Sequence, residues 1–531
     1  MEKIGRGTWL DKVADEIIKR EKELERNLDI INVESGLGAS GIPHVGSIGD
    51  AIRAYGIKLA LEDLGYKTKL IAYSDDMDGL RKVPEGLPDK LNEYIAKPVS
   101  HIYDPLECHE SYGAHMSALL LDGLDKLNIE YEFHSAKESY EKGIMNKQIH
   151  KILSNSKKIG QQISEMTGQE KFQNVLPYYP ICEECGRLYT AHANEYDQDK
   201  KTIIYDCLGT EIAGKWIEGC KNKGVIKIED GKGKLSWKSE FAARWSALDI
   251  RFEAHGKDLI DSVRINDWVS DEILNFNHPH HIQYELFLDK SGKKISKSIG
   301  NVFTPQKWLE FGTPESLFLL MYKRITGTRN LSADDIPTYI EEIDHLENIY
   351  FNKTNMDNDT KKQRLKGLYE YIHHLNPPDE LKKHVPFSLL IQLSSVSPNN
   401  NKIEWINNKL IDYGYFKEHE QHITNLIKLS INFTEQISYK KEKINIEIDG
   451  EEKTAISEII SVLEQKNSPE DIQYMIFEVA KKNGIKPAKL FKTLYKILIG
   501  VDRGPKLGKY ITDIGNDKVI SMLEEFINTK V

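Results

Sequence analysis

Two segments about 250 residues apart carry the side-chain types that bind and activate a nucleoside triphosphate. The first, residues 39–47, reads Ala-Ser-Gly-Ile-Pro-His-Val-Gly-Ser. Gly41 and Gly46 would let backbone N–H groups approach phosphate, and the amino end of a following helix favours the same anionic groups. His44, protonated or hydrogen-bonding, could stabilise the charge that grows on an α-phosphate when a carboxylate attacks it. By itself, His44 would be interpreted as a histidine that caps a loop.

The second segment, residues 293–298, reads Lys-Lys-Ile-Ser-Lys-Ser. Lys294 and Lys297, with Ser296 between them, make a cationic loop that could neutralise the β- and γ-phosphates and the departing pyrophosphate. The alternative is an ordinary basic surface loop. Its position after a predicted strand and before a predicted helix favours the phosphate-binding interpretation.

Four of the five cysteines fall in one stretch, as Cys182, Cys185, Cys207 and Cys220. A C-x2-C turn presents two thiolates together, and four thiolates suit tetrahedral zinc. The last two spacings are irregular, so free structural thiols are the alternative interpretation.

A second candidate metal site lies within twelve residues and contains Asp104, Cys108, His109 and His115. The i to i+4 spacing of Asp104 and Cys108 predicts two ligand atoms on one helix face, and this ligand mixture suits zinc. The alternative is a helix with satisfied surface histidines.

The elements that would position these residues can be predicted from hydrophobic periodicity and from glycine. A buried strand, a glycine-rich loop, a helix and a second strand are expected over residues 28–33, 36–41, 47–64 and 69–73. Parallel strands with right-handed crossovers bind ligands beyond their carboxyl ends. The His44 loop and the acidic loop at residues 74–78 should therefore face one pocket.

The middle and the end of the chain have different patterns. Residues 282–288 predict a strand that leads into the lysine loop, and Thr304 with Pro305 predicts the start of a helix. After residue 331 the pattern predicts only helices, two of which begin at Pro469 and Pro487.

Composition is that of a globular protein of about three or four domains, with 531 residues, 40% hydrophobic and 29% charged. No long apolar run indicates a membrane span, and the first twenty residues lack a signal-peptide pattern, so a cytoplasmic location is expected. The net charge of -10 disfavours indiscriminate binding of nucleic acid. A local basic face is still available, because residues 481–509 contain nine Lys or Arg and one acid.

His44-Val45-Gly46-Ser47 resembles the "HIGH" element of class I aminoacyl-tRNA synthetases, and residues 294–298 resemble their "KMSKS" loop. Ser47 stands where that element has its second histidine. Three further segments resemble the class I, archaeal-type lysyl-tRNA synthetases. They are residues 74–84, His255-Gly256-Lys257-Asp258 and residues 504–508. The likeness extends over almost the whole chain.

This resemblance implies a Rossmann-type α/β catalytic domain with a zinc-binding insertion, followed by an all-α C-terminal domain that binds the anticodon. The implied segments are a first half of the catalytic domain, an insertion, a second half and the helical domain, over residues 1–95, 96–240, 241–330 and 331–531. The implied reaction joins lysine to tRNA(Lys) with ATP and Mg²⁺. Enzymes of this kind often require tRNA even for the first step, and the same is expected here. The chain is expected to be a monomer.

The resemblance also implies roles for single residues. The catalytic set would be His44, Ser47, Lys294 and Lys297, and the ATP-binding set would be Gly41, His44, Gly46, Gly256, Asp258, Lys294, Ser296 and Lys297. A lysine ammonium needs carboxylate, so Glu34, Asp75 and Asp76 are expected at the amino acid, with Trp245 against its aliphatic stem. The cluster at Asp104 and the four cysteines become structural zinc sites.

Three alternatives remain open at this point. A glutamyl- or glutaminyl-type synthetase would need a cation for its amino acid, which the acidic loop at Asp75 disfavours. A small-molecule adenylyltransferase would not need a helical region of about 200 residues. A catalytically silent RNA-binding relative would not need His44, Lys294 and Lys297.

Overall fold

Five parallel strands form the sheet that organises the first part of the computed structural model, which describes residues 4–288, 303–437, 446–465 and 467–528. Their order is β12, β11, β1, β2 and β3, with bounds His280–Tyr284, Ile250–Gly256, Ile31–Leu37, Thr68–Ser74 and Glu132–Ser135. All neighbouring pairs are parallel. The chain moves outward from β1 to β3 on one side and from β11 to β12 on the other. The strand order therefore changes direction between β1 and β11, where open α/β sheets bind their ligands.

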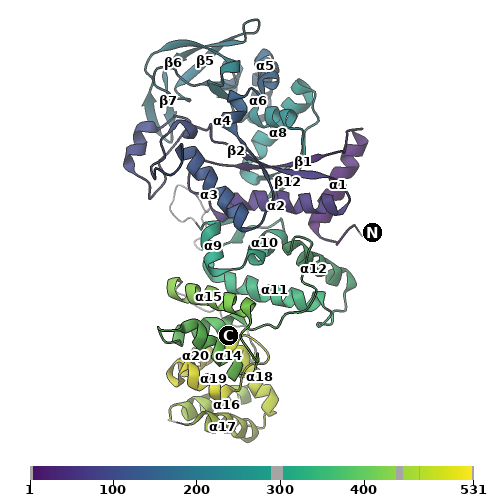
Figure 1. Ribbon diagram of the computed structural model, residues 1–531, viewed down its shortest axis with the longest axis vertical. Coiled ribbons are helices and arrows are strands. Elements are labelled where there is room, and N and C mark those ends of the chain that lie inside the picture. The colour runs from purple at the N-terminus through teal and green to yellow at the C-terminus, as the bar shows by residue number, and fades with distance from the viewer. Residues whose placement is uncertain (1–3, 289–302, 438–445, 466, 529–531) are drawn as a thin grey trace. The chain divides into compact units, whose positions relative to one another are not determined.

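Helices cover both faces of this sheet (Figure 1), with α2 and α3 on one side and α4, α6 and α8 on the other. The helices of this region are α1 (Trp9–Glu23), α2 (Val45–Asp63), α3 (Tyr112–Lys126), α4 (Ala136–Glu141), α5 (Asn146–Ser154), α6 (Ser156–Thr167), α7 (Glu240–Ala247) and α8 (Ile260–Val269). The predicted α/β class is confirmed.

Helix α2 packs so closely on its neighbours that a Cβ on Gly56 would lie 2.8 Å from the Tyr322 ring and 2.9 Å from Leu10.

The first strand begins and ends later in the chain than the pattern predicts. Residues 28–30 precede β1, and the strand continues through Gly36, a residue that the pattern predicts to be in the loop. Gly36 pairs with Tyr73 of β2, and β11 lies on the other side of β1. The pairing of Gly36 with β2 outweighs the low strand preference of glycine here.

The strand predicted over residues 282–288 is also two elements, β12 and the short β13 (Phe287–Leu288). β13 leaves the main sheet and pairs in parallel with β14 (Arg329–Asn330). The apolar run is therefore split between two sheets, which periodicity cannot reveal.

Between α6 and α7 the chain forms several small sheets instead of extending the main one. Their strands are β4 (Tyr178–Pro180), β5 (Ala191–Asp197), β6 (Thr202–Cys207), β7 (Gly209–Ile212), β8 (Lys215–Glu218), β9 (Lys223–Lys227) and β10 (Gly233–Leu235). β4 pairs with β10, β6 lies between β5 and β9, and β7 pairs with β8, all antiparallel. The four grouped cysteines lie on or between these strands.

The chain separates into two compact units. The first contains Met1–Leu309, Pro314–Ser332 and Asn352–Pro378, and includes α10 (Pro314–Tyr322) and α12 (Asp359–Ile372). Helix α9 (Pro305–Phe311) begins where Thr304 and Pro305 predicted, and the Thr304 hydroxyl accepts the Lys307 N–H at 3.1 Å. The four-segment division from the sequence is finer than this one and stays a prediction.

The second unit is all-helical in its described residues, as predicted. Its helices are α11 (Ile336–Tyr350), α13 (Phe387–Val396), α14 (Lys402–Asp412), α15 (Gln421–Gln436), α16 (Gly450–Leu463), α17 (Pro469–Lys482), α18 (Pro487–Ile499), α19 (Leu507–Ile514) and α20 (Asn516–Asn528). α17 starts at Pro469 with a capping box between Ser468 and Asp471, and α18 starts at Pro487.

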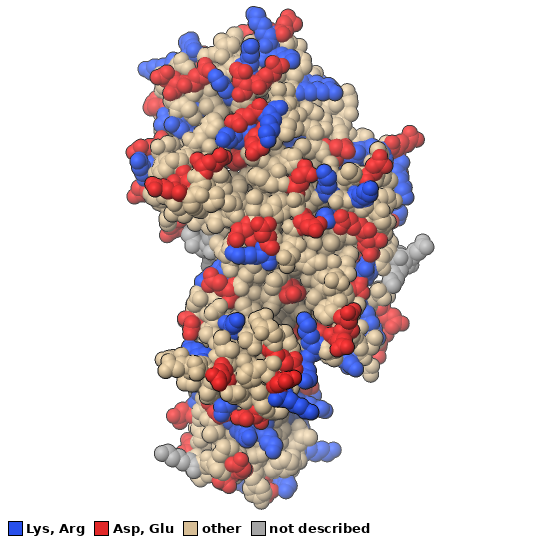
Figure 2. Space-filling model, in the orientation of Figure 1, with Lys and Arg blue, Asp and Glu red and all other residues tan. Residues whose placement is uncertain are grey.

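Charged side chains of both signs are interspersed on the face drawn in Figure 2. Among the helices that the structure describes, none combines the length and the apolar character needed to span a bilayer.

Candidate active site

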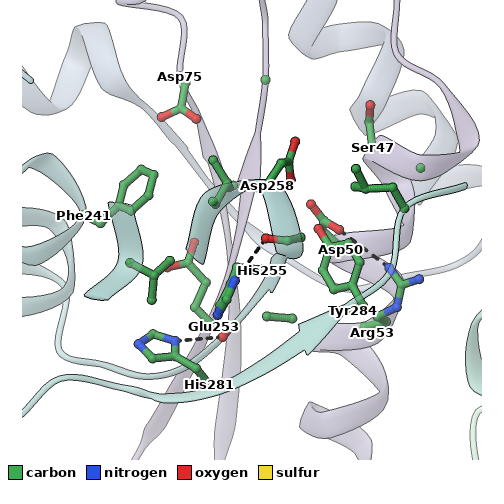
Figure 3. A pocket seen from close by; sticks show the side chains of 18 of the residues that line it. Ser47, Asp50, Arg53, Asp75, Phe241, Glu253, His255, Asp258, His281 and Tyr284 are labelled. Atoms are coloured by element: carbon green, nitrogen blue, oxygen red, sulfur yellow. Dashed lines mark hydrogen bonds and ion pairs between the residues drawn. The ribbon is translucent and has the colours of Figure 1, made fainter. Parts of the chain in front are cut away.

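A cavity of about 320 Å³ opens at the carboxyl ends of β1, β2, β11 and β12 (Figure 3). Its wall includes Gly36 near the end of β1, Gly38 directly after it, Asp75 after β2, Gly256 at the end of β11 and Tyr284 at the end of β12. The first turns of α2 and one face of α7 complete the wall. The expectation that the His44 loop and the acidic loop face one pocket is confirmed.

His44 caps the amino end of α2 with its own side chain. Its Nδ1 accepts the backbone N–H of Ser47 at 3.1 Å. A ring nitrogen that accepts an N–H carries no proton, so the neutral imidazole of His44 has its proton on Nε2 and can donate from that atom. Of the two forms considered from the sequence, this geometry favours the neutral hydrogen-bond donor.

The spacing of Gly46 and Ser47 from His44 has a steric reason. A Cβ on Gly46 would lie 2.8 Å from Cε1 and 2.9 Å from Nδ1 of His44, so only glycine lets the imidazole fold back over the helix end. The Ser47 hydroxyl accepts the His44 backbone N–H at 3.5 Å and completes a capping box. Ser47, which replaces the second histidine of the motif, therefore has a capping role here.

Asp50 and Arg53 extend the same helix face into the cavity, and the sequence analysis did not single them out. The Arg53 guanidinium is buried 4.1 Å from the centre of the Tyr284 ring, and its Nη1 lies 3.6 Å from an Asp50 oxygen. Burial raises the pKa of Asp50 to about 7, although Arg53 acts in the opposite direction. The sequence could have identified both residues, because residues 46, 50 and 53 share one face of the helix that His44 caps.

Arg244 lies at the centre of a buried group of carboxylates. Its Nε pairs with Glu34, its Nη1 lies 3.2 Å from Asp75, and its Nη2 lies 3.1 Å from Glu253. Burial raises the pKa of Glu34 well above its usual range and that of Asp75 to about 7, against the opposing effect of Arg244. Two of the predicted amino-acid ligands are thus in contact with one internal cation, and Asp75 also lines the cavity.

A second buried cation lies beside the first. Lys234 Nζ is 2.5 Å from Asp78 and 2.8 Å from Glu240, and Trp237 donates its indole N–H to Asp78 at 3.1 Å. The two clusters together contain five buried carboxylates and two buried cations. The carboxylates are Glu34, Asp75, Asp78, Glu240 and Glu253, and the cations are Lys234 and Arg244. Such an excess of acid favours a cationic ligand.

Other residues predicted for the site lie elsewhere. Asp76 accepts hydrogen bonds from the Ser135 hydroxyl at 2.6 Å and the Lys137 N–H at 2.8 Å, so it anchors the start of α4 instead of facing the cavity. Trp245 is fully buried behind Glu253, to which it donates its indole N–H at 2.5 Å. Gly41 lies outside the cavity wall as well.

Two further aromatic residues line the cavity, one just before α7 and one in its first turn. Trp237 and Phe241 belong to its wall, whereas Trp245, one turn further along, does not. Residues 237, 241 and 244 have helical spacing, which could have identified this face from the sequence.

Gly256 and Asp258 both line the cavity, at the end of β11. A Cβ on Gly256 would lie 2.6 Å from an Asp258 oxygen, so glycine allows this carboxylate to turn back toward the strand. The neighbouring His281 faces two acceptors, with Nδ1 3.1 Å from the Glu253 carbonyl oxygen and Nε2 3.0 Å from an Asp267 carboxylate oxygen. Lys294, Ser296 and Lys297 lie outside the described residues.

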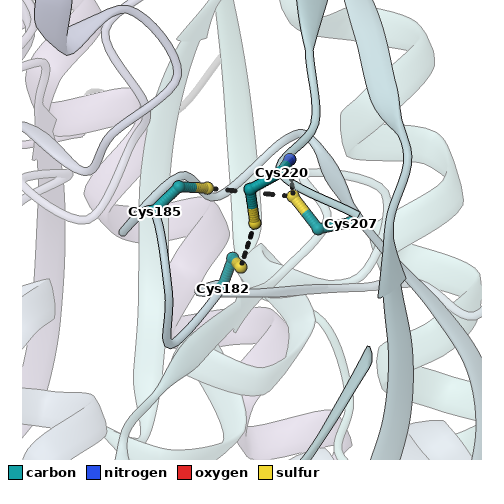
Figure 4. Close-up of side chains that lie close together, drawn as sticks. All are labelled: Cys182, Cys185, Cys207 and Cys220. Carbon is teal, nitrogen blue, oxygen red and sulfur yellow. Dashed lines mark hydrogen bonds between the residues drawn. The ribbon is translucent and has the colours of Figure 1, made fainter. Parts of the chain in front are cut away.

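The four grouped cysteines converge on one point (Figure 4), with their sulfurs within 4.8 Å of one another. Cys182 and Cys220 are 3.5 Å apart, and Cys185 and Cys207 are 3.8 Å apart. Four sulfurs at about 2.3 Å from a zinc ion stand about 3.8 Å from each other, so the set fits tetrahedral zinc.

Backbone hydrogen bonding also prepares this group for a cation. Although burial alone raises it, hydrogen bonds from the backbones of Cys185 and Glu184 lower the pKa of the Cys182 thiol to about 7. The Cys220 N–H points at the Cys207 sulfur from 3.4 Å. Groups that donate to thiolates orient them for a metal.

The second cluster converges as well, but the predicted helix at Asp104 is wrong. Residues 104–111 form a loop before α3, because Pro105 disfavours helix at Asp104 and the Asp104 carboxylate accepts three backbone N–H groups. The Cys108 sulfur lies 3.2 Å from His109 Nδ1 and 3.3 Å from His115 Nδ1, which is 3.2 Å from Asp104. One oxygen, one sulfur and two nitrogens therefore surround one point, a donor set that zinc accepts.

Comparison with known proteins agrees with this geometry. A family model described as tRNA synthetases class I (K) matches residues 7–375, and one described as an anticodon binding domain matches residues 410–527. A lysine–tRNA ligase of Cenarchaeum symbiosum (strain A) is 51% identical, over 98% of this chain and 99% of that protein. One of Rickettsia bellii (strain OSU 85-389) is 31% identical, over 97% of this chain and 100% of that protein.

Replacing Arg244 by Met should destabilise the first unit by about 3–5 kcal/mol, because buried carboxylates would lose their cation. The destabilisation should be larger at pH 8 than at pH 5. Carboxyl groups whose folded-state pKa is raised bind more protons when folded, so stability falls with rising pH. Urea unfolding at both pH values measures this, with the exposed Arg264→Met on α8 as the control. Equal midpoints for the two variants would show that Arg244 does not balance this charge.

Proposed function

The chain belongs to the class I (K) family of tRNA synthetases, and we propose on that basis that it is a lysine–tRNA ligase, which activates lysine with ATP and transfers it to tRNA. Identity of 51% over nearly the whole length of a lysine–tRNA ligase carries the proposal. The cavity wall supports it, because its acidic residues outnumber its basic ones and a lysine side chain is a cation, whereas glutamate would bring a further negative charge. The acidic residues are Asp50, Asp75, Glu253, Asp258 and Glu285, and the basic ones are Arg53 and Arg244.

In the first step, a lysine carboxylate oxygen attacks the α-phosphorus of the Mg²⁺–ATP complex. The new O–P bond forms as the bond to the β-phosphate bridging oxygen breaks, which gives lysyl-adenylate and pyrophosphate. His44 Nε2–H would donate to the α-phosphate oxygen on which charge accumulates. Lys294 and Lys297 would neutralise the departing pyrophosphate. Gly256 and Asp258, which line the same cavity, would hold the nucleoside.

In the second step, a hydroxyl of the terminal tRNA ribose attacks the lysyl carbonyl carbon, and AMP leaves. Catalysis in both steps would come from positioning and electrostatics. The dependence of the first step on tRNA, a monomeric state and a cytoplasmic location are predictions carried over from the sequence.

For the lysine side chain we propose Asp75 and Glu253 as the contacts, because both line the cavity and both pair with Arg244. An incoming ammonium would add a second positive charge to this group and keep Asp75 ionised despite its raised pKa of about 7. Glu34 would act behind them through Arg244.

Zinc would be held at two structural sites, one by Cys182, Cys185, Cys207 and Cys220 and the other by Asp104, Cys108, His109 and His115. When bound, the ions would cross-link segments that are separated in the sequence. Neither group lines the active-site cavity, so no catalytic role follows.

Charging of tRNA with each of the twenty labelled amino acids tests the activity directly. Lysine should be attached in an ATP-dependent reaction and the other nineteen should not. Attachment of glutamate or glutamine in place of lysine would refute the assignment, and adenylation of a small molecule without tRNA charging would favour an adenylyltransferase.

Replacing His44 by Ala should slow lysine-dependent ATP–pyrophosphate exchange by about 100- to 1,000-fold, with tRNA present, because a donor to the transition-state charge is lost. Gly46→Ala should also be slow, since its Cβ would displace the imidazole. Ser47→Ala is the matched control, as Ser47 uses its backbone N–H to bond His44. If Ser47→Ala were as slow as His44→Ala, the helix cap and not the imidazole would be the feature that matters.

The purified chain should contain two zinc ions, measured by elemental analysis. Cys220→Ala should lose one of them and His109→Ala the other, because each removes one ligand of a separate cluster. His101→Ala, a neighbouring histidine outside both clusters, should retain both. Unchanged zinc in either ligand variant would exclude that cluster as a site.

A further inference from the structure

A third group of metal-type ligands lies in the helical unit, away from the active-site cavity and from the two clusters described above. Asp344 and Glu347 lie three residues apart on α11, so their side chains share one face of that helix. His384 comes from residues 381–386, a segment without helix or strand that precedes α13. One ligand atom of each side chain lies within 4.8 Å of the other two. Two carboxylates and one imidazole from separate parts of the chain therefore converge on one point.

The imidazole of His384 faces both carboxylates through the same nitrogen. Its Nε2 lies 2.7 Å from Glu347 Oε2 and 3.9 Å from Asp344 Oδ1. Ligand atoms that each stand about 2.1 Å from one metal ion lie about 3.0–3.4 Å from each other. The two observed separations bracket these values, so the group needs little rearrangement to surround an ion.

Neighbouring groups hold these ligands in place. Glu347 is almost fully buried, and its other oxygen, Oε1, accepts the backbone N–H of Lys382 at 3.0 Å. Asn348 lies against the second ring nitrogen, with Nδ2 3.3 Å from His384 Nδ1. A metal-bound imidazole carries its proton on the nitrogen that faces away from the ion, so Asn348 would turn its amide oxygen toward that proton. Partners of this kind fix the orientation of metal ligands.

The charge around the group favours a cation. Glu341, one turn before Asp344 on α11, brings a third carboxylate to the same region. Burial raises the pKa of Asp344 to about 7, and Glu347 and Glu341 act in the same direction, whereas His384 opposes them. Lys382, whose charge also acts on Glu347 and His384, is exposed. Three carboxylates are thus set against one imidazole and one solvated ammonium, and a divalent ion would offset the excess negative charge.

The donor set indicates which ions fit. Carboxylate oxygens together with an imidazole nitrogen, and no thiolate, suit Mn²⁺ and Zn²⁺. The side chains of Asp344 and His384 are 26% and 20% exposed, so water can complete the shell of the ion. Three protein ligands with an open side predict an ion that exchanges with solvent, unlike zinc at the two four-ligand clusters.

We propose that Asp344, Glu347 and His384 bind one exchangeable divalent transition-metal ion, which links α11 to the segment before α13. The ion would replace the proton that His384 Nε2 directs at Glu347, and that proton would move to Nδ1 or leave to solvent. Residues 381–386 would then have a second attachment to α11 besides the hydrogen bond of the Lys382 N–H. The site does not depend on the proposed function, because it shares no residue with the active-site cavity.

Titration of the full chain with Mn²⁺, in the absence of ATP, tests the site, since the loss of the free Mn²⁺ EPR signal counts bound ions. Prior dialysis against a weak chelator should leave zinc at the two four-ligand clusters. His384→Ala and Asp344→Asn should each bind one Mn²⁺ fewer per chain than the parent. Asn348→Ala should keep the ion with roughly 10- to 100-fold weaker affinity, the usual cost of losing a partner behind a metal ligand. His345→Ala is the matched control, because His345 is an exposed histidine of the same helix outside the group.

Limited proteolysis measures what the ion does to the chain. Lys382 and Lys383 are exposed next to His384, so trypsin cleavage after either lysine reports how firmly this segment is attached to α11. Mn²⁺ should slow that cleavage several-fold in the parent and leave it unchanged in His384→Ala. Cleavage after Lys482, at the end of α17, is the internal reference and should not respond to Mn²⁺ in either protein.

Equal Mn²⁺ counts in the parent, His384→Ala and Asp344→Asn would overturn the proposal, because the ion would then lie elsewhere. A parent that binds no Mn²⁺ at millimolar concentration would overturn it too, and His384 would then only bridge two carboxylates. Circular dichroism shows whether each variant is folded before its ions are counted. Should both ligand variants unfold, the parent alone decides, since Mn²⁺ that binds without slowing cleavage after Lys382 or Lys383 lies at another site and refutes the proposal.

Discussion

The reversal of strand order between β1 and β11 is the constraint on which the active site depends. Strands on the two sides of this point are followed by helices on opposite faces, so no crossover covers the carboxyl ends of the central strands. Segments distant in the chain, such as the His44 loop and Gly256, meet there for this topological reason. The helix dipole of α2 and the N–H donors at its start then face the cavity that the sheet leaves open.

A buried group of charges lies at and behind one wall of this cavity, to which it contributes Asp75, Glu253 and Arg244. Burying five carboxylates against two cations is costly, and such groups are retained where a ligand supplies the missing charge or where they fix one conformation. Arg244 connects carboxylates on β1, on β11 and directly after β2, so it also links the strands at which the cavity opens. Specificity and stability therefore share the same side chains, and a change at Arg244 should affect both.

The parts of the chain away from the main sheet differ from it in structure and in the side chains that they leave for binding. The two ligand clusters lie among the small antiparallel sheets between α6 and α7 and in the loop before α3. The helical unit instead buries ordinary apolar stripes and leaves Tyr474 and Phe477 uncovered. Catalysis, loop cross-linking and RNA contact would thus be assigned to regions with distinct packing, a separation that lets each vary without disturbing the others.

The sequence by itself determined the α/β class, the helical end, the family and the spacing of His44, Gly46 and Ser47, because these depend on local periodicity and on residues close in the chain. It misplaced β1 and expected a helix at Asp104, since pairing on both sides of a strand and side-chain capping of a loop are tertiary effects. Only the tertiary structure decided that Asp75 faces the cavity while the adjacent Asp76 does not, and that Trp245 is core whereas Trp237 is wall. Neighbouring residues of the same type have the same sequence signal, and the direction in which each side chain points is set by the elements packed against it.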